Sequence, residues 1–157
     1  MKQTRFWLVI IAVLLCSISA RAHDFEVDGI YYNVTSSSEL TVEVTYCGEY
    51  WYSYLYEYQG VVKIPSTVVY NGKTYRLTSI GSEAFDGFSG LTSIILPEGL
   101  TSIGSEAFDG CYGLTSINLP EGLTSIGGEA FRDCRGLTSI TLPESLTLIA
   151  EDAFAYC

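Results

Sequence analysis

Residues 91–113 read LTSIILPEGLTSIGSEAFDGCYG, and residues 114–136 read LTSINLPEGLTSIGGEAFRDCRG. A third copy, LTSITLPESLTLIAEDAFAYC, begins at Leu137, so the sequence repeats itself every 23 residues. A unit of this length carries one apolar edge that it cannot bury by itself, so copies must stack side by side and share a continuous core. The period therefore predicts a repeat solenoid, whose function would be carried by a surface.

Each unit is expected to form one coil of short elements. Residues 114–119 have the L-x-x-I-x-L spacing of a short strand, and Pro-Glu-Gly at 120–122 ends that strand in a turn. Residues 123–126 form a second extended edge, and residues 128–131 suit a single helical or 3-10 turn. Stacked coils would pair their strands in parallel.

Successive units carry the same apolar residues at the same positions, which predicts the core. The aligned columns are Leu91/Leu114/Leu137, Ile94/Ile117/Ile140, Leu96/Leu119/Leu142, Leu100/Leu123/Leu146, Ile103/Ile126/Ile149, Ala107/Ala130/Ala153 and Phe108/Phe131/Phe154. A further column holds Cys111, Cys134 and Cys157, with Phe88 at its start. A position that accepts Phe or Cys is apolar, which favours buried thiols over a metal site, while a disulfide between adjacent coils stays open.

The repeat extends upstream of the first full copy in a modified form. Residues 77–87 match the back half of a unit, and Ile64-Pro65 aligns with Leu96-Pro97. Between these two segments, Asn71-Gly72 is a hairpin signal flanked by residues that favour strands. We therefore expect repeats over residues 61–157, with a hairpin insert in the first unit and an incomplete last unit.

Residues 23–60 lack the repeat and are expected to form a β-rich cap. Residues 25–34 and 40–46 have the composition of strands. Five tyrosines then recur at every second position, namely Tyr50, Tyr52, Tyr54, Tyr56 and Tyr58. An extended segment would place all five on one face. That face would either shield the first coil of the solenoid or offer an aromatic platform to sugars or to a partner protein.

Residues 1–22 have the features of a secretory signal peptide. A basic start is followed by 13 apolar residues, and Ala20-Arg21-Ala22 gives the small-x-small pattern that signal peptidase recognises. The apolar run is shorter than the ~20 residues that a helix needs to cross a bilayer. We therefore expect cleavage after Ala22, no transmembrane segment in the mature chain, and a secreted or cell-surface location.

The charge of the mature chain argues against nucleic acid as a partner. Removing the predicted signal peptide leaves 5 of the 8 basic side chains against 18 acidic ones. A protein that binds phosphate backbones needs clustered Lys and Arg side chains to release counterions. The acidic excess instead favours solubility.

The sequence does not predict an enzyme. His23 is the only histidine and would stand at the mature N-terminus, so a Ser-His-Asp or Cys-His pair has no base. Acidic residues do recur with the repeat, at Glu83, Glu106, Glu129 and Asp152 and again at Glu98, Glu121 and Glu144. The repetition explains them as solvated turns, and a D-x-D-x-D-G calcium loop is missing. We expect no catalytic residue, metal or cofactor.

The unit L-T-S-I-x-L-P-E-G-L-T-S-I-G-x-E-A-F-x-x-C resembles the BspA-like leucine-rich repeat of bacterial surface proteins. The lead-in over residues 58–75 also resembles the usual start of such proteins, so the resemblance covers residues 58–157. It implies a curved leucine-rich repeat solenoid. It also implies a protein that host-associated bacteria secrete or display, and some members act as adhesins for matrix proteins, plasma proteins or other bacteria.

The last unit is two residues short of a full copy and has no recognisable cap or sorting segment. Leu142, Ile149 and Phe154 are then expected to lie under an open end of the stack, where exposed apolar edges favour pairing. Self-association through this coil and a longer parent protein are both consistent with the sequence.

Two functions follow from these features. The first is a protein-binding or adhesion module toward host matrix or plasma glycoproteins or other bacterial surface proteins, acting through the outer face of the strands. Its predicted contact residues are Ser93, Ile95, Ser116, Asn118, Ser139 and Thr141. The alternative is a non-enzymatic scaffold or spacer of the cell envelope, with any binding carried by the tyrosines at positions 50–58 or by sequence outside this chain.

Overall fold

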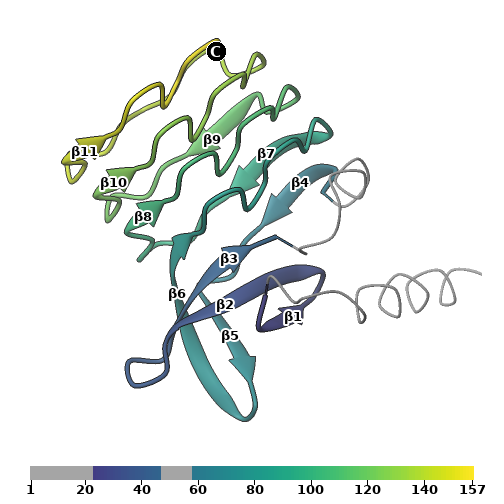
Figure 1. Ribbon diagram of the computed structural model, residues 1–157, viewed down its shortest axis with the longest axis vertical. Helices are drawn as coiled ribbons and strands as arrows, with labels where there is room; N and C mark the ends of the chain where they lie inside the picture. The colour runs from purple at the N-terminus through teal and green to yellow at the C-terminus, as the bar shows by residue number, and fades with distance from the viewer. Residues whose placement is uncertain (1–22, 47–57) are drawn as a thin grey trace, which may run out of the picture.

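The computed structural model describes residues 23–46 and 58–157, which form strands and turns without a helix. The strands are β1 (Phe25–Val27), β2 (Ile30–Ser36), β3 (Thr41–Thr45), β4 (Gly60–Lys63), β5 (Thr67–Tyr70), β6 (Lys73–Ile80), β7 (Leu91–Ile95), β8 (Ser102–Ile103), β9 (Ser116–Asn118), β10 (Ser125–Ile126) and β11 (Leu148–Ile149). The coils rise from β4 and β6 to β11, and the β5–β6 hairpin projects at the opposite end (Figure 1). The predicted signal peptide and the tyrosines at positions 50–56 lie outside the described residues.

One long sheet joins the N-terminal strands to the repeats, in the order β1-β2-β3-β6-β8-β10-β11, with β5 paired to β6. The first three strands pair antiparallel, whereas β3, β6, β8, β10 and β11 pair in parallel. The single strand expected over residues 25–34 is wrong, because Asp28 and Gly29 turn with φ of 53° and 80° and split it into β1 and β2. An Asp-Gly dipeptide suits the left-handed φ angles that a tight hairpin turn requires.

A second, shorter sheet consists of β4, β7 and β9, all parallel. Its register brings Lys63 opposite Ile95 and Ile95 opposite Asn118, one coil above the other. The corresponding segment of the third unit, residues 137–142, continues the coil without an assigned strand. The two sheets form two sides of the stacked coils (Figure 1).

The helical or 3-10 turn expected in each unit is not formed. At the corner of each coil one acidic residue adopts a left-handed φ of 56° to 58°, at Glu83, Glu106, Glu129 and Asp152. A left-handed residue interrupts a right-handed helix, so the neighbouring N–H groups need other acceptors. The Phe108 N–H donates to the Ala130 carbonyl, and the Phe131 N–H donates to the Ala153 carbonyl, both at 2.8 Å. These bonds to the next coil alternate with single i→i+3 bonds, such as that from the Asp109 N–H to the Glu106 carbonyl at 3.1 Å, so each corner forms turns and no continuous helix.

The expected core columns pack as predicted in the inner coils. Phe85, Phe108, Phe131 and Phe154 form a stack with ring centroids 5.1 to 5.2 Å apart. Cys111 and Cys134 are buried, and their thiols donate to the carbonyls of Phe85 and Phe108 in the coil below. Cys111, Cys134 and Cys157 are free thiols, so the disulfide that the sequence left open between adjacent coils is not formed among these three.

Candidate functional site

The outer face of the β4–β7–β9 sheet presents two columns of side chains. Leucine and isoleucine at the first and fourth positions of each unit point into the core, which leaves the residues between them to face solvent. One outer column runs Lys63, Ile95, Asn118, and the other runs Val61, Ser93, Ser116. The repeat therefore builds a ladder of mostly small, uncharged groups that contains two exposed apolar side chains, Val61 and Ile95.

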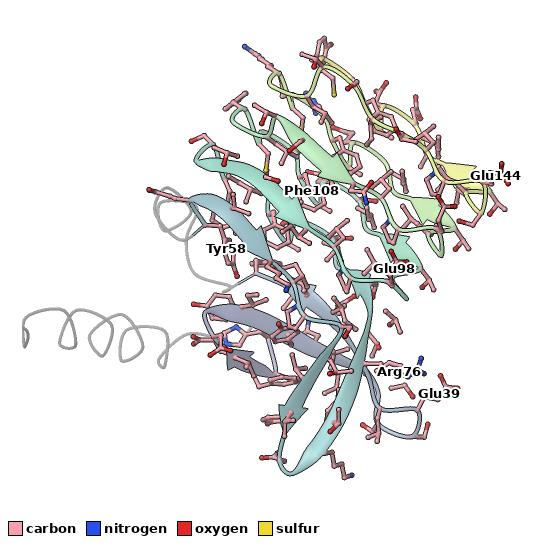
Figure 2. The ribbon with its side chains drawn as sticks, turned by 180° about the vertical axis from the view of Figure 1, so that it is seen from behind. Glu39, Tyr58, Arg76, Glu98, Phe108 and Glu144 are labelled. Carbon is pink, nitrogen blue, oxygen red and sulfur yellow. The ribbon has the colours of Figure 1, made fainter. Side chains whose placement is uncertain are left out.

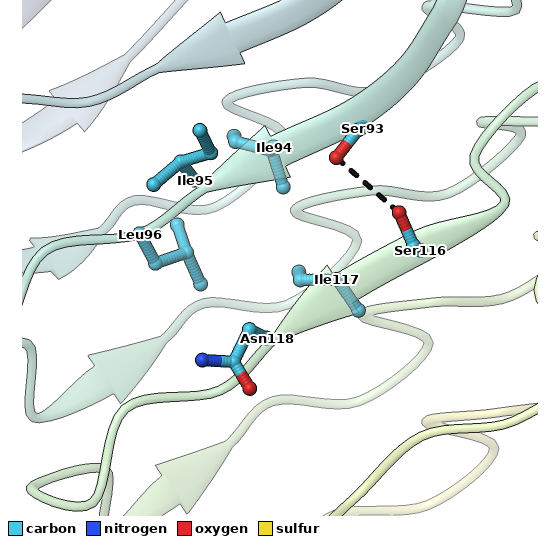
Figure 3. A pocket seen from close by; sticks show the side chains of 7 residues that line it. All are labelled: Ser93, Ile94, Ile95, Leu96, Ser116, Ile117 and Asn118. Atoms are coloured by element: carbon cyan, nitrogen blue, oxygen red, sulfur yellow. Dashed lines mark hydrogen bonds between the residues drawn. The ribbon is translucent and has the colours of Figure 1, made fainter.

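A shallow hollow of about 220 Å³ lies between β7 and β9 (Figure 3). It is lined by Ser93, Ile94, Ile95, Leu96, Ser116, Ile117 and Asn118. Ile95 is 48% exposed, and the Ser116 hydroxyl donates to the Ser93 hydroxyl at 3.3 Å. Pockets for drug-sized ligands usually exceed about 300 Å³. The hollow therefore suits one protruding side chain of a partner.

Four of the six predicted contact residues meet at this hollow, namely Ser93, Ile95, Ser116 and Asn118. Ser139 and Thr141 are exposed in the next coil but do not line it. Their segment has no assigned strand. The structure therefore concentrates the predicted face on the first two full units.

Val61 and Lys63 belong to this face and were missed from the sequence. Both are exposed, and they pair in register with Ser93 and Ile95. The signal was available in the alignment of Ile64-Pro65 with Leu96-Pro97, which places Val61 and Lys63 at the outer positions of the first unit.

Tyr58 does not belong to an exposed aromatic face, which corrects that part of the sequence-based alternative. It is 7% exposed, its ring packs 5.0 Å from Phe85 and 4.9 Å from Phe88, and its hydroxyl donates to the Gly29 carbonyl at 3.0 Å (Figure 2). Burying an aromatic ring against the first phenylalanines of the stack removes apolar surface from water. Tyr58 thus packs as part of the cap over the first coil.

Six copies of the BspA type leucine rich repeat match residues 73–157. The chain belongs to the BspA-type leucine-rich repeat family. This confirms the resemblance of the repeat unit to that family. No curated protein matches the sequence.

Solved structures similar to this BspA-type chain come from several bacteria. A leucine-rich cell surface protein from Faecalibacterium prausnitzii is 27% identical with a TM-score of 0.71, over 85% of this chain and 34% of its own. A leucine-rich repeat protein from Bacteroides ovatus is 37% identical with a TM-score of 0.58, over 84% and 38%. The T. pallidum leucine-rich repeat protein is 30% identical with a TM-score of 0.68, over 83% and 55%. The chain spans less than two thirds of each of these three proteins.

The acidic corner of the BspA-type coils has distinctive electrostatics. Burial, followed by repulsion from Asp109 and from neighbouring glutamates, raises the pKa of Asp86 to about 6. Burial likewise raises the pKa values of Glu106 and Asp109. An ion pair between Arg132 and Glu129 offsets part of this charge. Within residues 23–46 and 58–157, no cluster of His, Cys, Asp and Glu could hold a metal ion, and no helix could span a membrane.

Proposed function

We propose that this chain is a non-enzymatic protein-binding module of an exported bacterial surface protein. The observation that carries the proposal is the outer face of the β4–β7–β9 sheet. There the exposed Ile95 pairs in register with Lys63 and Asn118 and lines the hollow between β7 and β9. Membership of the BspA-type family and the similarity to a cell surface protein support a surface location. The signal peptide predicted for residues 1–22 would direct export.

The composition of this face suits a protein partner. The centre of a protein interface is depleted in charge and contains apolar groups that fill pockets on the partner. Here Val61 and Ile95 are exposed, serine and asparagine surround them, and Lys63 supplies the one charge of the two outer columns. The hollow beside Ile95 would receive a side chain of the partner in return. The partners that the family resemblance implies are matrix or plasma glycoproteins of a host, or other bacterial surface proteins.

Binding of the purified chain to an array of matrix glycoproteins and plasma proteins tests this proposal. Asn118→Arg places a long charged side chain on the hollow and is expected to abolish saturable binding. Thr141→Arg, one coil away, reports how far the contact extends. Ser105→Arg adds the same side chain at an exposed position outside the face and serves as the matched control.

Saturable binding that survives both Asn118→Arg and Thr141→Arg would reject this face as the contact surface. The absence of binding to every protein in the array would favour the alternative, a structural scaffold or spacer of the cell envelope.

A further inference from the structure

One corner of the coils departs from the repeat. The units at residues 91–113 and 114–136 differ at five of their 23 positions, and three of these five lie close together near the end of the unit. There Asp109-Gly110 is replaced by Arg132-Asp133, and Tyr112 is replaced by Arg135. The apolar columns of the two units are identical, so core packing does not account for the exchange.

Asp133 stands at a backbone position where the two preceding units have glycine. Its φ is 55°, and the equivalent Gly87 and Gly110 have φ of 73° and 66°. A residue with a side chain is less stable than glycine in this left-handed region. Strained residues of this kind often lie at functional sites, so the contacts of the Asp133 side chain are informative.

The Asp133 carboxylate holds the guanidinium group of Arg135 by its edge. The Arg135 Nε and Nη2 groups donate to the Asp133 Oδ1 atom at 2.9 and 2.7 Å. The Asp133 Oδ2 atom lies 4.0 Å from the Nε atom of Arg132, which also pairs with Glu129. The Arg135 Cζ atom lies over the Tyr112 ring, 5.2 Å from its centroid. Arg135 is therefore oriented from one edge by Asp133 and from one face by Tyr112.

The tip of Arg135 remains accessible. Its side chain is 67% exposed, and among the described residues no acceptor binds its Nη1 group. The Nη1–Nη2 edge of the guanidinium is therefore a free fork of two donors, with the spacing of the two oxygens of a carboxylate. This exposure does not depend on an open end of the stack. Tyr112 is 50% exposed in the same column although Arg135 lies over it.

The charges of the coils favour a carboxylate at this fork. Arg132 and Arg135 are the only basic residues of residues 77–157, where every unit carries acidic residues. An anionic group is repelled elsewhere on the coils and is attracted at this corner, which fixes where it can bind. A bidentate bond from arginine to a carboxylate is also stronger than a bond to a neutral acceptor.

We propose that Arg135 anchors a second protein-binding surface, which takes the side-chain carboxylate of an aspartate or glutamate of a partner protein. Arginine and tyrosine are enriched among the residues that dominate binding energy at protein interfaces, and here Tyr112 lies beside the anchor. None of the residues of this corner lines the hollow between β7 and β9. The proposal therefore does not rest on the proposed function of the β4–β7–β9 face.

NMR titration of the isotope-labelled full chain with an acetylated and amidated (Glu-Gly)3 peptide tests the proposal. A saturable shift of the Arg135 Nε–H signal is expected. The (Gln-Gly)3 peptide has the same shape without the charges and should bind at least about tenfold more weakly. Arg76 gives an internal comparison, because it is exposed and forms no ion pair with a described residue. Its signal should shift less, since no aspartate or tyrosine orients it.

Two variants separate the oriented fork from the charge alone. Arg135→Lys keeps the positive charge but removes the fork, and should weaken binding of the (Glu-Gly)3 peptide about tenfold. Tyr112→Ser, which introduces the residue that the first unit has at Ser89, should also weaken it because Arg135 loses its support. Arg76→Lys is the matched control and should leave the affinity unchanged. All these side chains are exposed, so the variants should keep the amide spectrum of the folded chain.

Three results would overturn the assignment. The first is the lack of a saturable shift of the Arg135 signal with the (Glu-Gly)3 peptide. The second is equal affinity for the (Gln-Gly)3 peptide, which would indicate a neutral acceptor. The third is an affinity that Arg135→Lys leaves unchanged, which would indicate attraction by charge without the fork. The shift of the Arg135 signal should persist in Asn118→Arg, so this test and the test of the β4–β7–β9 face fail independently.

Discussion

The phenylalanine column shows that the same residue contributes differently to stability according to its position in the stack. Phe85, Phe108 and Phe131 are fully buried, whereas Phe154 in the last coil is half-buried. The successive rings are nearly parallel, with interplanar angles of 2°, 6° and 0°. Each inner ring is covered by a ring on both sides, so its removal opens a cavity that neighbours cannot easily fill.

Phe131→Ala should therefore lower the free energy of unfolding by about 3 to 5 kcal/mol. Phe154→Ala removes the same atoms from a half-buried position and should cost clearly less. Urea unfolding of the two variants and of the wild type measures the difference. Equal losses would show that the last coil packs as tightly as the inner ones.

Asp86 should make stability depend on pH. Its pKa of about 6 in the fold lies above the value of an unfolded aspartate, so the folded chain holds this proton more tightly. Its contribution to stability therefore rises as the pH falls through about 6 and is lost as the carboxylate ionises above it. Asp86→Asn, which is neutral at every pH, should raise the urea midpoint at about pH 8 and flatten its pH profile between about pH 4 and 7.

Glu98→Gln changes the net charge by the same amount at an exposed edge of the stack, where Figure 2 labels Glu98 two coils from Glu144. It controls for the overall charge of an acidic chain. An Asp86→Asn profile that follows the Glu98→Gln profile would contradict a special role of Asp86.

At the scale of the element, very short strands form because each one is hydrogen-bonded to the coils on either side of it. β8, β10 and β11 contain two residues each, too few to form alone. Threonine hydroxyls add to the ladder, since Thr101, Thr124 and Thr147 each donate to the threonine carbonyl of the coil below. The stack also requires close contact between backbones at its corners.

Gly113 marks such a corner. A Cβ at this position would lie 2.4 Å from the Ser89 carbonyl oxygen of the coil below, so Gly113→Ala must push the two coils apart. We expect a loss of about 1 to 3 kcal/mol in the free energy of unfolding, the usual cost of overpacking. Gly122→Ala is the control, because its Cβ would approach the Leu100 carbonyl oxygen only to 3.6 Å and the equivalent position of the next unit is Ser145. Chemical denaturation of both variants measures these losses. An unchanged free energy of unfolding for Gly113→Ala would mean that adjacent coils can separate at little cost.

At the scale of the whole molecule, the two ends of the stack differ. The first coil is covered by the N-terminal strands and by Tyr58, whereas residues 137–157 present exposed apolar side chains. These are Leu142, Leu148, Ile149 and Tyr156. Leu119 and Ile126, the equivalents of Leu142 and Ile149 one coil earlier, are buried, so stacking accounts for the exposure of those two residues. Leu148 and Tyr156 stand where the previous unit has Ser125 and Asp133.

We propose that a purified chain of residues 1–157 self-associates through this surface as its concentration rises. Leu148→Lys puts a charge on the exposed strand β11 and should shift the population to monomer in sedimentation velocity. Val69→Lys places the same charge at an exposed apolar residue of the β5–β6 hairpin and should not. A wild type that stays monomeric at every concentration would contradict the proposal.

The repeat period by itself determined the architecture. Each unit repeats the same pattern of apolar and turn residues, so stacked units align the same apolar side chains in columns. The alternation around Ile95 and Asn118 also predicted which side chains of the strands face outward. The expected helical turn is not assigned because alternate backbone N–H groups at the corner bond to the next coil, a contact that a single unit does not contain. The Asp28-Gly29 turn could have been read from its dipeptide.

Only the tertiary structure decided the contacts between segments that are not copies of one another, such as the cap and the first coil. It placed Val61 and Lys63 on the outer face, buried Tyr58 against Phe85, and joined the β1–β2 hairpin to the end of β4 around the Tyr32 phenol. A periodic pattern specifies neighbours one period away, and such a contact recurs in every unit. Contacts between the cap and the first coil occur once, between residues far apart in the chain, so their geometry is set by packing and leaves no period in the sequence to read.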